Sequence, residues 1–423
     1  MRKLFTGQFR LQVGTTFVAQ ILSALFAIIN AALVARWLGV EGKGVLSLLL
    51  LVPNMLGLFL GGGIGVANVY YTGVRRWDIR TLVQNSMGMT FLATALGVVG
   101  VGIAALSGVL PQILPNVPLP LVFVALIAFP INLLSGYLAA ILQGLQRIIT
   151  VNLVTVLQSV VTLVLNILLV VVLNRGLIGA LTASILAGAV NLVVVGWLLY
   201  QVGARFRPTW NPTVMRSTLG YGLRGYVGNV LQFFNYRLDM FIVNYFLGTA
   251  GTGIYSVSVA LAELLWYLPN AVGFVIFPKA AASKPEVMNR FTPRVFGLTL
   301  ALTFLAGLGL AGIGRPFIRI VYSEDFLPAY VPLLVLLPGV ILMGSAKVLT
   351  NEIAGRGYPH YNSINSGLAL IVTIGLDLLF IPRYGVLGAS IASSIAYTLI
   401  FFTAIGFYYI VSRRSTGEKT AES

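Results

Sequence analysis

The sequence has no cysteine among its 423 residues and a single histidine, His360. Without cysteine the chain cannot form a disulfide, a thiol nucleophile or a cysteine-ligated metal site. One histidine is too few for a histidine-rich metal centre, and no Walker A sequence is present. We therefore expect no cofactor and no metal, and we expect a protein that is not an enzyme.

Charged side chains are also scarce. They make up 9% of the residues, against 58% hydrophobic residues and a mean hydropathy of +0.94. Soluble domains carry about 25% charged residues, so these values exclude a water-soluble fold. The few charges are mostly basic, with a net charge of +16. In a membrane protein such an excess indicates loops that bind anionic membrane lipids, and we expect no nucleic-acid partner.

Twelve apolar runs are long enough to cross a bilayer as helices, which takes about 20 residues each. They cover residues 11–35, 45–71, 81–107, 119–143, 151–173, 177–201, 218–247, 254–277, 295–313, 329–350, 363–381 and 386–411. The first run is too long for a signal peptide, so we expect it to be a retained span. The predicted fold is an all-α integral membrane protein with twelve transmembrane helices.

The basic residues predict the orientation. If the N-terminus is cytoplasmic, 18 of the 27 Lys and Arg residues fall in cytoplasmic segments and 6 in outer loops. Cytoplasmic loops of membrane proteins carry such an excess. The bias predicts that both termini and the basic segment 202–217 are cytoplasmic.

The two halves of the chain resemble each other at a constant offset of 209 residues. LGVEGKGVLS at 38–47 aligns with LGTAGTGIYS at 247–256, and GLIGALTAS at 176–184 aligns with GVLGASIAS at 385–393. Six spans per half return the chain to the same side, so the repeats are parallel and commonly enclose a central cavity. We predict an N-terminal six-helix bundle at 1–201, a cytoplasmic linker at 202–217 and a C-terminal bundle with a short tail at 218–423.

Polar residues inside the spans are the candidate substrate-binding residues, because each is costly in lipid. They concentrate on the seventh predicted span and recur on the first, second and eighth: Asn30, Asn54, Arg224, Asn229, Gln232, Tyr236, Arg237, Asp239 and Glu263. Structural alternatives remain for several charges. Arg237 and Asp239 could form a buried pair, Lys347 could snorkel to the inner interface, and Asp377 could be a solvated or paired helix end.

Two segments resemble the polysaccharide flippase family of the multidrug/oligosaccharidyl-lipid/polysaccharide exporter superfamily. They are ARWLGVEGKGVLSLLLLV at 35–52 and NYRLDMFIVNYFLG at 235–248. The resemblance implies a flippase in the plasma membrane, the bacterial inner membrane, that moves a polyprenyl-pyrophosphate-linked oligosaccharide to the outer leaflet by alternating access. It also implies roles for Arg237 and Asp239 in the cavity, and a glycan polymerase and glycosyltransferases as partners.

Two alternatives remain open. A proton- or sodium-coupled multidrug or cation antiporter of the same superfamily would use Glu263, Asp239 and Asp377 to bind the ion. A non-transporting scaffold for glycan assembly would use the basic loops, but the polar residues inside its spans would then have no purpose.

Overall fold

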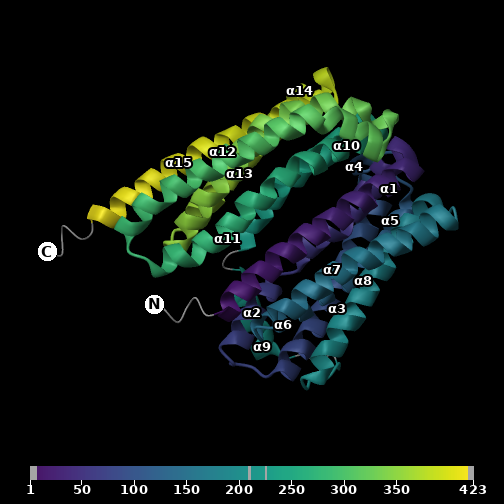
Figure 1. Cartoon of the computed structure of the whole chain (residues 1–423). Coiled ribbons are helices and arrows are strands. Elements are labelled where there is room, and N and C mark those ends of the chain that lie inside the picture. The colour runs from purple at the N-terminus through teal and green to yellow at the C-terminus, as the bar shows by residue number, and fades with distance from the viewer. Residues whose placement is uncertain (1–6, 208–210, 224–225, 418–423) are drawn as a thin grey trace. The chain divides into compact units, whose positions relative to one another are not determined.

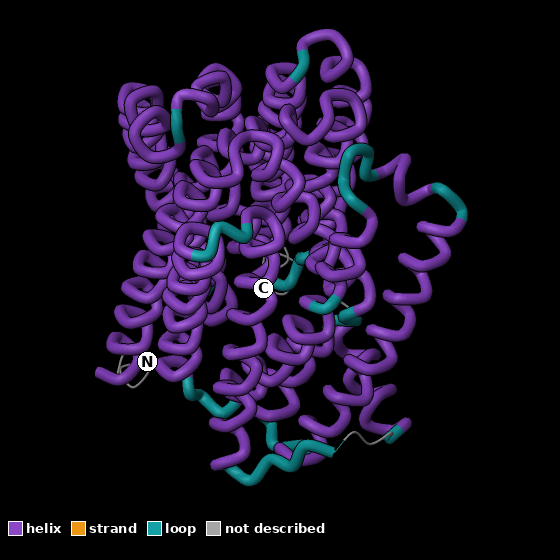
Figure 2. Tube along the Cα trace, turned by 90° about the vertical axis from the view of Figure 1, so that its right-hand side faces the viewer, coloured by secondary structure: helices purple, strands orange, loops and turns teal. Residues whose placement is uncertain are grey.

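The computed structural model describes residues 7–207, 211–223 and 226–417. All regular secondary structure in these ranges is helical, as Figure 2 shows. The chain divides into two compact units, Met1–Tyr226 and Val227–Ser423. Helices dominate because lipid offers no hydrogen bonds, so each backbone group must be satisfied within its own segment. The predicted all-helical fold is confirmed.

The described part of unit 1 holds nine α-helices, drawn in purple to teal in Figure 1. A π-helical turn, Ile167–Val172, continues α7. The helices are α1 (Gly7–Leu60), α2 (Ile64–Gly73), α3 (Ile79–Leu106), α4 (Val109–Ile113), α5 (Leu119–Leu126), α6 (Ala128–Gly144), α7 (Ile148–Asn166), α8 (Gly176–Gln201) and α9 (Pro212–Gly222).

Unit 2 is built around α13, which packs against α11, α12 and α15. Short turns of other helix types, η4 (Leu264–Trp266), η5 (Ile318–Tyr322) and η6 (Glu324–Ala329), join some of its α-helices. These are α10 (Tyr226–Glu263), α11 (Tyr267–Ala282), α12 (Pro285–Phe317), α13 (Tyr330–Gly355), α14 (His360–Tyr384) and α15 (Val386–Gly417).

Ten helical segments of the described chain are long and apolar enough to cross a membrane. The protein is therefore a multi-pass membrane protein, as its composition predicts. The two longest segments, Val18–Leu60 and Val230–Phe277, have 43 and 48 residues. Each is about twice the length that one crossing needs.

Each of these long segments is interrupted by one glycine. Gly39 in α1 has φ 68° and ψ −174°, and Gly248 in α10 has φ 69° and ψ −170°. Only glycine adopts this backbone conformation readily. The two glycines are 209 residues apart, the offset of the sequence repeat. The repeat therefore recurs in the backbone, where a specific turn requires glycine at the same place in each unit.

The chain turns back on itself at Gly248. The hydroxyl of Tyr255 donates a hydrogen bond to Oδ2 of Asp239 at 2.5 Å. In a straight helix these residues would be about 24 Å apart along the axis. Because they bond across the turn, α10 is a hairpin of two antiparallel helical arms.

The same reversal occurs in unit 1. Asn152 and Asn166 of α7 donate side-chain hydrogen bonds of 2.8 Å to Thr16 and Asn30. The first arm of α1 therefore runs parallel to α7. In Figure 1, α2, which follows α1, lies at the same end of unit 1 as the start of α1. The chain thus reverses within α1, and Gly39 is its non-helical residue.

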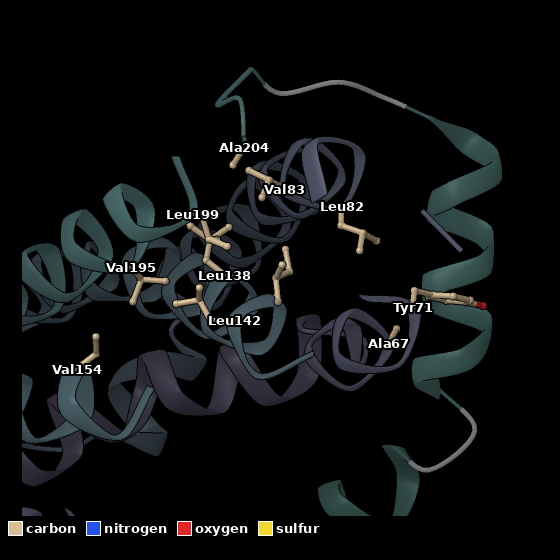
Figure 3. Close-up of a cluster of buried hydrophobic side chains, with 11 residues drawn as sticks. Ala67, Tyr71, Leu82, Val83, Leu138, Leu142, Val154, Val195, Leu199 and Ala204 are labelled. Atoms are coloured by element: carbon tan, nitrogen blue, oxygen red, sulfur yellow. The ribbon is translucent and has the colours of Figure 1, made fainter. Parts of the chain in front are cut away.

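A buried apolar cluster holds together one end of unit 1. Figure 3 shows side chains of α2, α3, α6, α7 and α8 converging there. Tyr71 of this cluster donates its hydroxyl to the carbonyl of Ser217 on α9 at 3.2 Å. Asn211 caps α9 by accepting hydrogen bonds from Thr213 N and Val214 N. Residues 212–217, predicted as linker, thus lie in a helix packed against α2.

Candidate functional site

Five of the nine predicted site residues can be described in detail in unit 2. Gln232, Tyr236, Arg237, Asp239 and Glu263 all belong to α10. Arg224 and the side chain of Asn229 lie outside the described residues. Asn30 and Asn54 belong to α1 in unit 1.

Arg237 and Glu263 form an ion pair across the α10 hairpin. Nη1 and Nη2 of the arginine donate to Oε1 and Oε2 of the glutamate at 2.8 and 3.0 Å. This parallel, two-bond arrangement is the strong geometry for a guanidinium and a carboxylate. The side chains are 30% and 23% exposed, so unit 2 does not fully enclose the pair. The arginine can therefore exchange one planar anion for another without leaving its position.

An aromatic group lies beside this pair. Tyr236, Trp266 and Tyr397 have ring centroids 5.0 to 6.2 Å apart. Gln232 donates to the Tyr236 hydroxyl at 2.9 Å, and the indole of Trp266 donates to the carbonyl of Val340 at 3.0 Å. These bonds fix the rings to α10, η4 and α13.

Lys347 of α13 lies over the rings of Tyr236 and Trp266. It was not among the predicted site residues. Its ammonium group lies 3.9 Å from the centroid of the Trp266 ring and donates to Oδ1 of Asn270 at 3.0 Å. A cation over an indole is stabilised by the ring quadrupole. Trp266 and Asn270 therefore hold the Lys347 ammonium group in place within unit 2. The available sequence signal was a lysine inside an apolar span, Lys347 in the run 329–350.

Asp239 belongs to a separate, fully buried network. It is 1% exposed and accepts bonds from the Tyr255 hydroxyl and, at 2.8 Å, from the backbone N–H of Met240. Ser393 of α15 lies 3.4 Å from the same carboxylate. Asp239 does not pair with Arg237 through any hydrogen bond recorded in the described part of unit 2. The polar residues predicted on the seventh span therefore fall into two sets. Arg237 is partly exposed, whereas Asp239 is buried.

Asp377 of α14 is also buried, with 0% exposure. In the described structure neither of its carboxylate oxygens has a hydrogen-bond partner. Two predicted alternatives, a solvated or a paired helix end, are therefore wrong for this residue. A buried carboxylate without a partner is costly when ionised, so Asp377 is suited to hold a proton or a cation.

Asn30 and Asn54 are the two predicted site residues in unit 1. Asn30 accepts its bond from Asn166, and Asn54 is exposed and donates to the carbonyl of Leu50 at 2.9 Å. Within the described ranges, no group of three or more His, Cys, Asp or Glu side chains could hold a metal ion.

Comparisons with known proteins agree with this fold. The probable flippase AglR of Haloferax volcanii is 25% identical over 233 residues, which cover 52% of this chain and 46% of that protein. The chain spans about half the length of the curated relatives it matches. These similarities are too partial to carry an activity across.

Solved structures match over nearly the whole chain. The lipid II flippase MurJ, in an inward closed conformation, has a TM-score of 0.76 at 14% identity, covering 95% of this chain and 90% of that one. An inward-facing multidrug resistance MATE family transporter of the MOP superfamily has a TM-score of 0.71 at 16% identity, covering 95% and 96%. At such low identity these matches establish the fold.

The family assignment comes from the sequence. Residues 33–331 match the family described as polysaccharide biosynthesis protein. That range includes both glycine turns, the Arg237–Glu263 pair and Asp239. The predicted resemblance is confirmed: the chain belongs to the polysaccharide biosynthesis protein family and has the fold shared by MurJ and the MATE transporters.

Proposed function

We propose that the protein is a flippase that moves a polyprenyl-diphosphate-linked oligosaccharide from the inner to the outer leaflet of the plasma membrane. Family membership, the similarity to a probable flippase and the MurJ-like fold support this proposal. The observation that carries it is the partly exposed Arg237–Glu263 pair within a membrane-spanning unit. Diphosphate and sugars need a polar path, whereas the polyprenyl tail can remain in lipid.

The pair supplies a mechanism for anion exchange. A guanidinium bonds phosphate in the same two-bond geometry that it uses for carboxylate. An entering diphosphate would therefore displace Glu263 from Arg237, and Lys347 would provide a second positive charge. Between cycles Glu263 neutralises the arginine, which would otherwise be costly in the membrane. Asn30 and Asn54, with Gln232 and Tyr236, would bond sugar hydroxyls.

The same proposal includes twelve spans. Counting each arm of the α1 and α10 hairpins separately raises the ten apolar segments to twelve. We place both termini and residues 202–217 in the cytoplasm, with a six-helix bundle in each unit and alternating access to a central cavity. A glycan polymerase and glycosyltransferases would consume and supply the lipid-linked glycan.

The test is the transport of a fluorescent polyprenyl-diphosphate oligosaccharide in proteoliposomes. Losing a charged hydrogen bond of about 1.5–3 kcal/mol should slow Arg237→Gln roughly tenfold or more, with partial recovery in Arg237→Lys. Arg319→Gln is the matched control, because Arg319 forms an exposed ion pair with Glu324 in the same unit.

A double variant separates transport from stability. Arg237→Gln with Glu263→Gln leaves two neutral side chains that can bond each other, so folding should recover while transport remains low. Normal transport by a folded Arg237→Gln protein would disprove the phosphate role.

The second candidate is an ion-coupled antiporter, favoured by the buried carboxylates of Asp239 and Asp377. In that case Asp377→Asn should abolish efflux driven by a proton or sodium gradient, while Arg237→Gln should have a small effect. Dye efflux from vesicles under each gradient distinguishes it from the flippase.

A further inference from the structure

Unit 1 contains a pocket of about 580 Å³ where two loops meet, the α2–α3 loop and the α6–α7 loop. Such a volume lies within the range of about 300–1,000 Å³ that small-ligand sites occupy. It is lined by Thr72, Gly73, Arg75, Trp77, Asp78, Ile79, Gly144, Leu145 and Gln146. None of these residues belongs to the site of the proposed flippase.

The two loops have the same backbone motif. Arg75 N bonds to Thr72 O and Arg76 N to Tyr71 O, which is the Schellman pattern at a helix C-terminus. The α6 end repeats it around Gln146. Arg75 and Gln146 have φ values of 53° and 62°, where glycine is the usual residue. Both positions instead carry long polar side chains, and both side chains line the pocket.

The helices α2 and α6 pack closely beside the pocket. A Cβ added at Gly144 would lie 2.6 Å from the Cβ of Thr72, so α2 and α6 approach as closely as glycine permits. Trp77, Ile79 and Leu145 pack against the buried cluster of Figure 3. The pocket is therefore held in shape by the core of unit 1 and does not depend on loop mobility.

Two buried polar atoms of residues that line the pocket have no partner in the described structure. They are Oγ1 of Thr72, a residue that is 6% exposed, and Nε1 of Trp77. Buried polar groups normally find a hydrogen-bond partner. Both atoms are enclosed by the protein, so a ligand in the pocket would instead contact the exposed side chains of Arg75 and Gln146.

The charges around the pocket favour an anion. Arg75 lines it, Arg76 and Arg147 lie exposed on the same loops, and Arg80 is exposed in the first turn of α3. The only acidic lining residue, Asp78, directs Oδ1 to the backbone N–H of Thr81 at 3.0 Å, where it caps α3. Its charge is therefore partly compensated by the helix N-terminus.

We propose that this pocket binds the phosphate of an anionic glycerophospholipid headgroup. Arg75 and Gln146 would donate to the phosphate oxygens from the two loops. A lipid is favoured over a soluble phosphate because the pocket lies at the ends of four apolar helices, where headgroups lie. Tryptophan and arginine are typical of that depth.

The test uses the full-length protein in detergent and measures retained lipid by native mass spectrometry. Phosphatidylglycerol should be retained at least fivefold better than phosphatidylcholine. Gln146→Gly and Arg75→Gly, which each remove a polar side chain that lines the pocket, should each abolish this preference. Arg75→Gly suits a left-handed backbone, so folding should be preserved. Arg205→Gly removes an exposed charge from the same unit and should retain the wild-type preference.

A competition experiment separates the sources of phosphate. Soluble glycerol 3-phosphate at millimolar concentration should not displace phosphatidylglycerol. Displacement would assign the pocket to a soluble phosphate ester and overturn the lipid proposal. Equal retention of the two lipids, or an unchanged preference in both pocket variants, would also overturn it.

Discussion

Replacing Gly39 with alanine tests the turn that divides α1. A Cβ at this position would meet no atom within 4 Å, so the whole cost comes from the backbone conformation, φ 68° and ψ −174°. Residues other than glycine pay about 1–3 kcal/mol in this region. For a unit of about 200 residues, each kcal/mol lowers the unfolding midpoint by roughly 2–4 °C. Gly39→Ala should therefore lower the midpoint by roughly 2–12 °C.

The assay is thermal unfolding of purified protein followed by tryptophan fluorescence. Gly100→Ala is the matched control, because its Cβ would also meet nothing within 4 Å but its backbone lies inside α3. There alanine should be neutral or stabilising by up to about 1 kcal/mol. Gly248→Ala should behave like Gly39→Ala. Equal midpoints for Gly39→Ala and Gly100→Ala would refute the argument.

Three further predictions concern packing, hydrogen bonding and topology. Gly144→Ala should lower the unfolding midpoint, because its Cβ would lie 2.6 Å from that of Thr72; an unchanged midpoint would show that α2 and α6 can separate. Trp266→Phe should cost about 1–3 kcal/mol by leaving a buried carbonyl of α13 without its donor, and chemical denaturation would reveal a smaller loss if water replaces it. In this cysteine-free chain, a cysteine at Ser107 should react with an impermeant maleimide in intact cells and one at Thr213 should not; the reverse result would invert the topology.

The sequence predicted the all-helical membrane fold well, for physical reasons. Long apolar runs with few charges have essentially one stable form in lipid. The 209-residue offset linked Gly39 to Gly248, and both have the same glycine-specific backbone. The predicted runs end at 35 and 247 and resume at 45 and 254, on either side of the two glycines. The pattern could not show that a single residue leaves the helical conformation at each turn.

The candidate site was less predictable because its contacts depend on how the helices turn and pack. Considered on one helix, Arg237 projects away from Gln232, Tyr236 and Asp239. Its partner, Glu263, becomes a neighbour only after the chain reverses at Gly248. Depth along a helix also misled the interpretation of Asp377, since distance from a helix end does not reveal which side faces the protein interior.

The α10 hairpin has a consequence for biosynthesis. An arginine or an acidic residue near the centre of a single helix opposes its transfer from the translocon to lipid by about 2.5–3.5 kcal/mol. The first arm of α10 carries Arg237, and its neutralising partner lies at the far end of the second arm. The arms are therefore expected to leave the translocon together, as one inserting unit. Synthesis must pass Glu263 before Arg237 can enter lipid with its charge compensated.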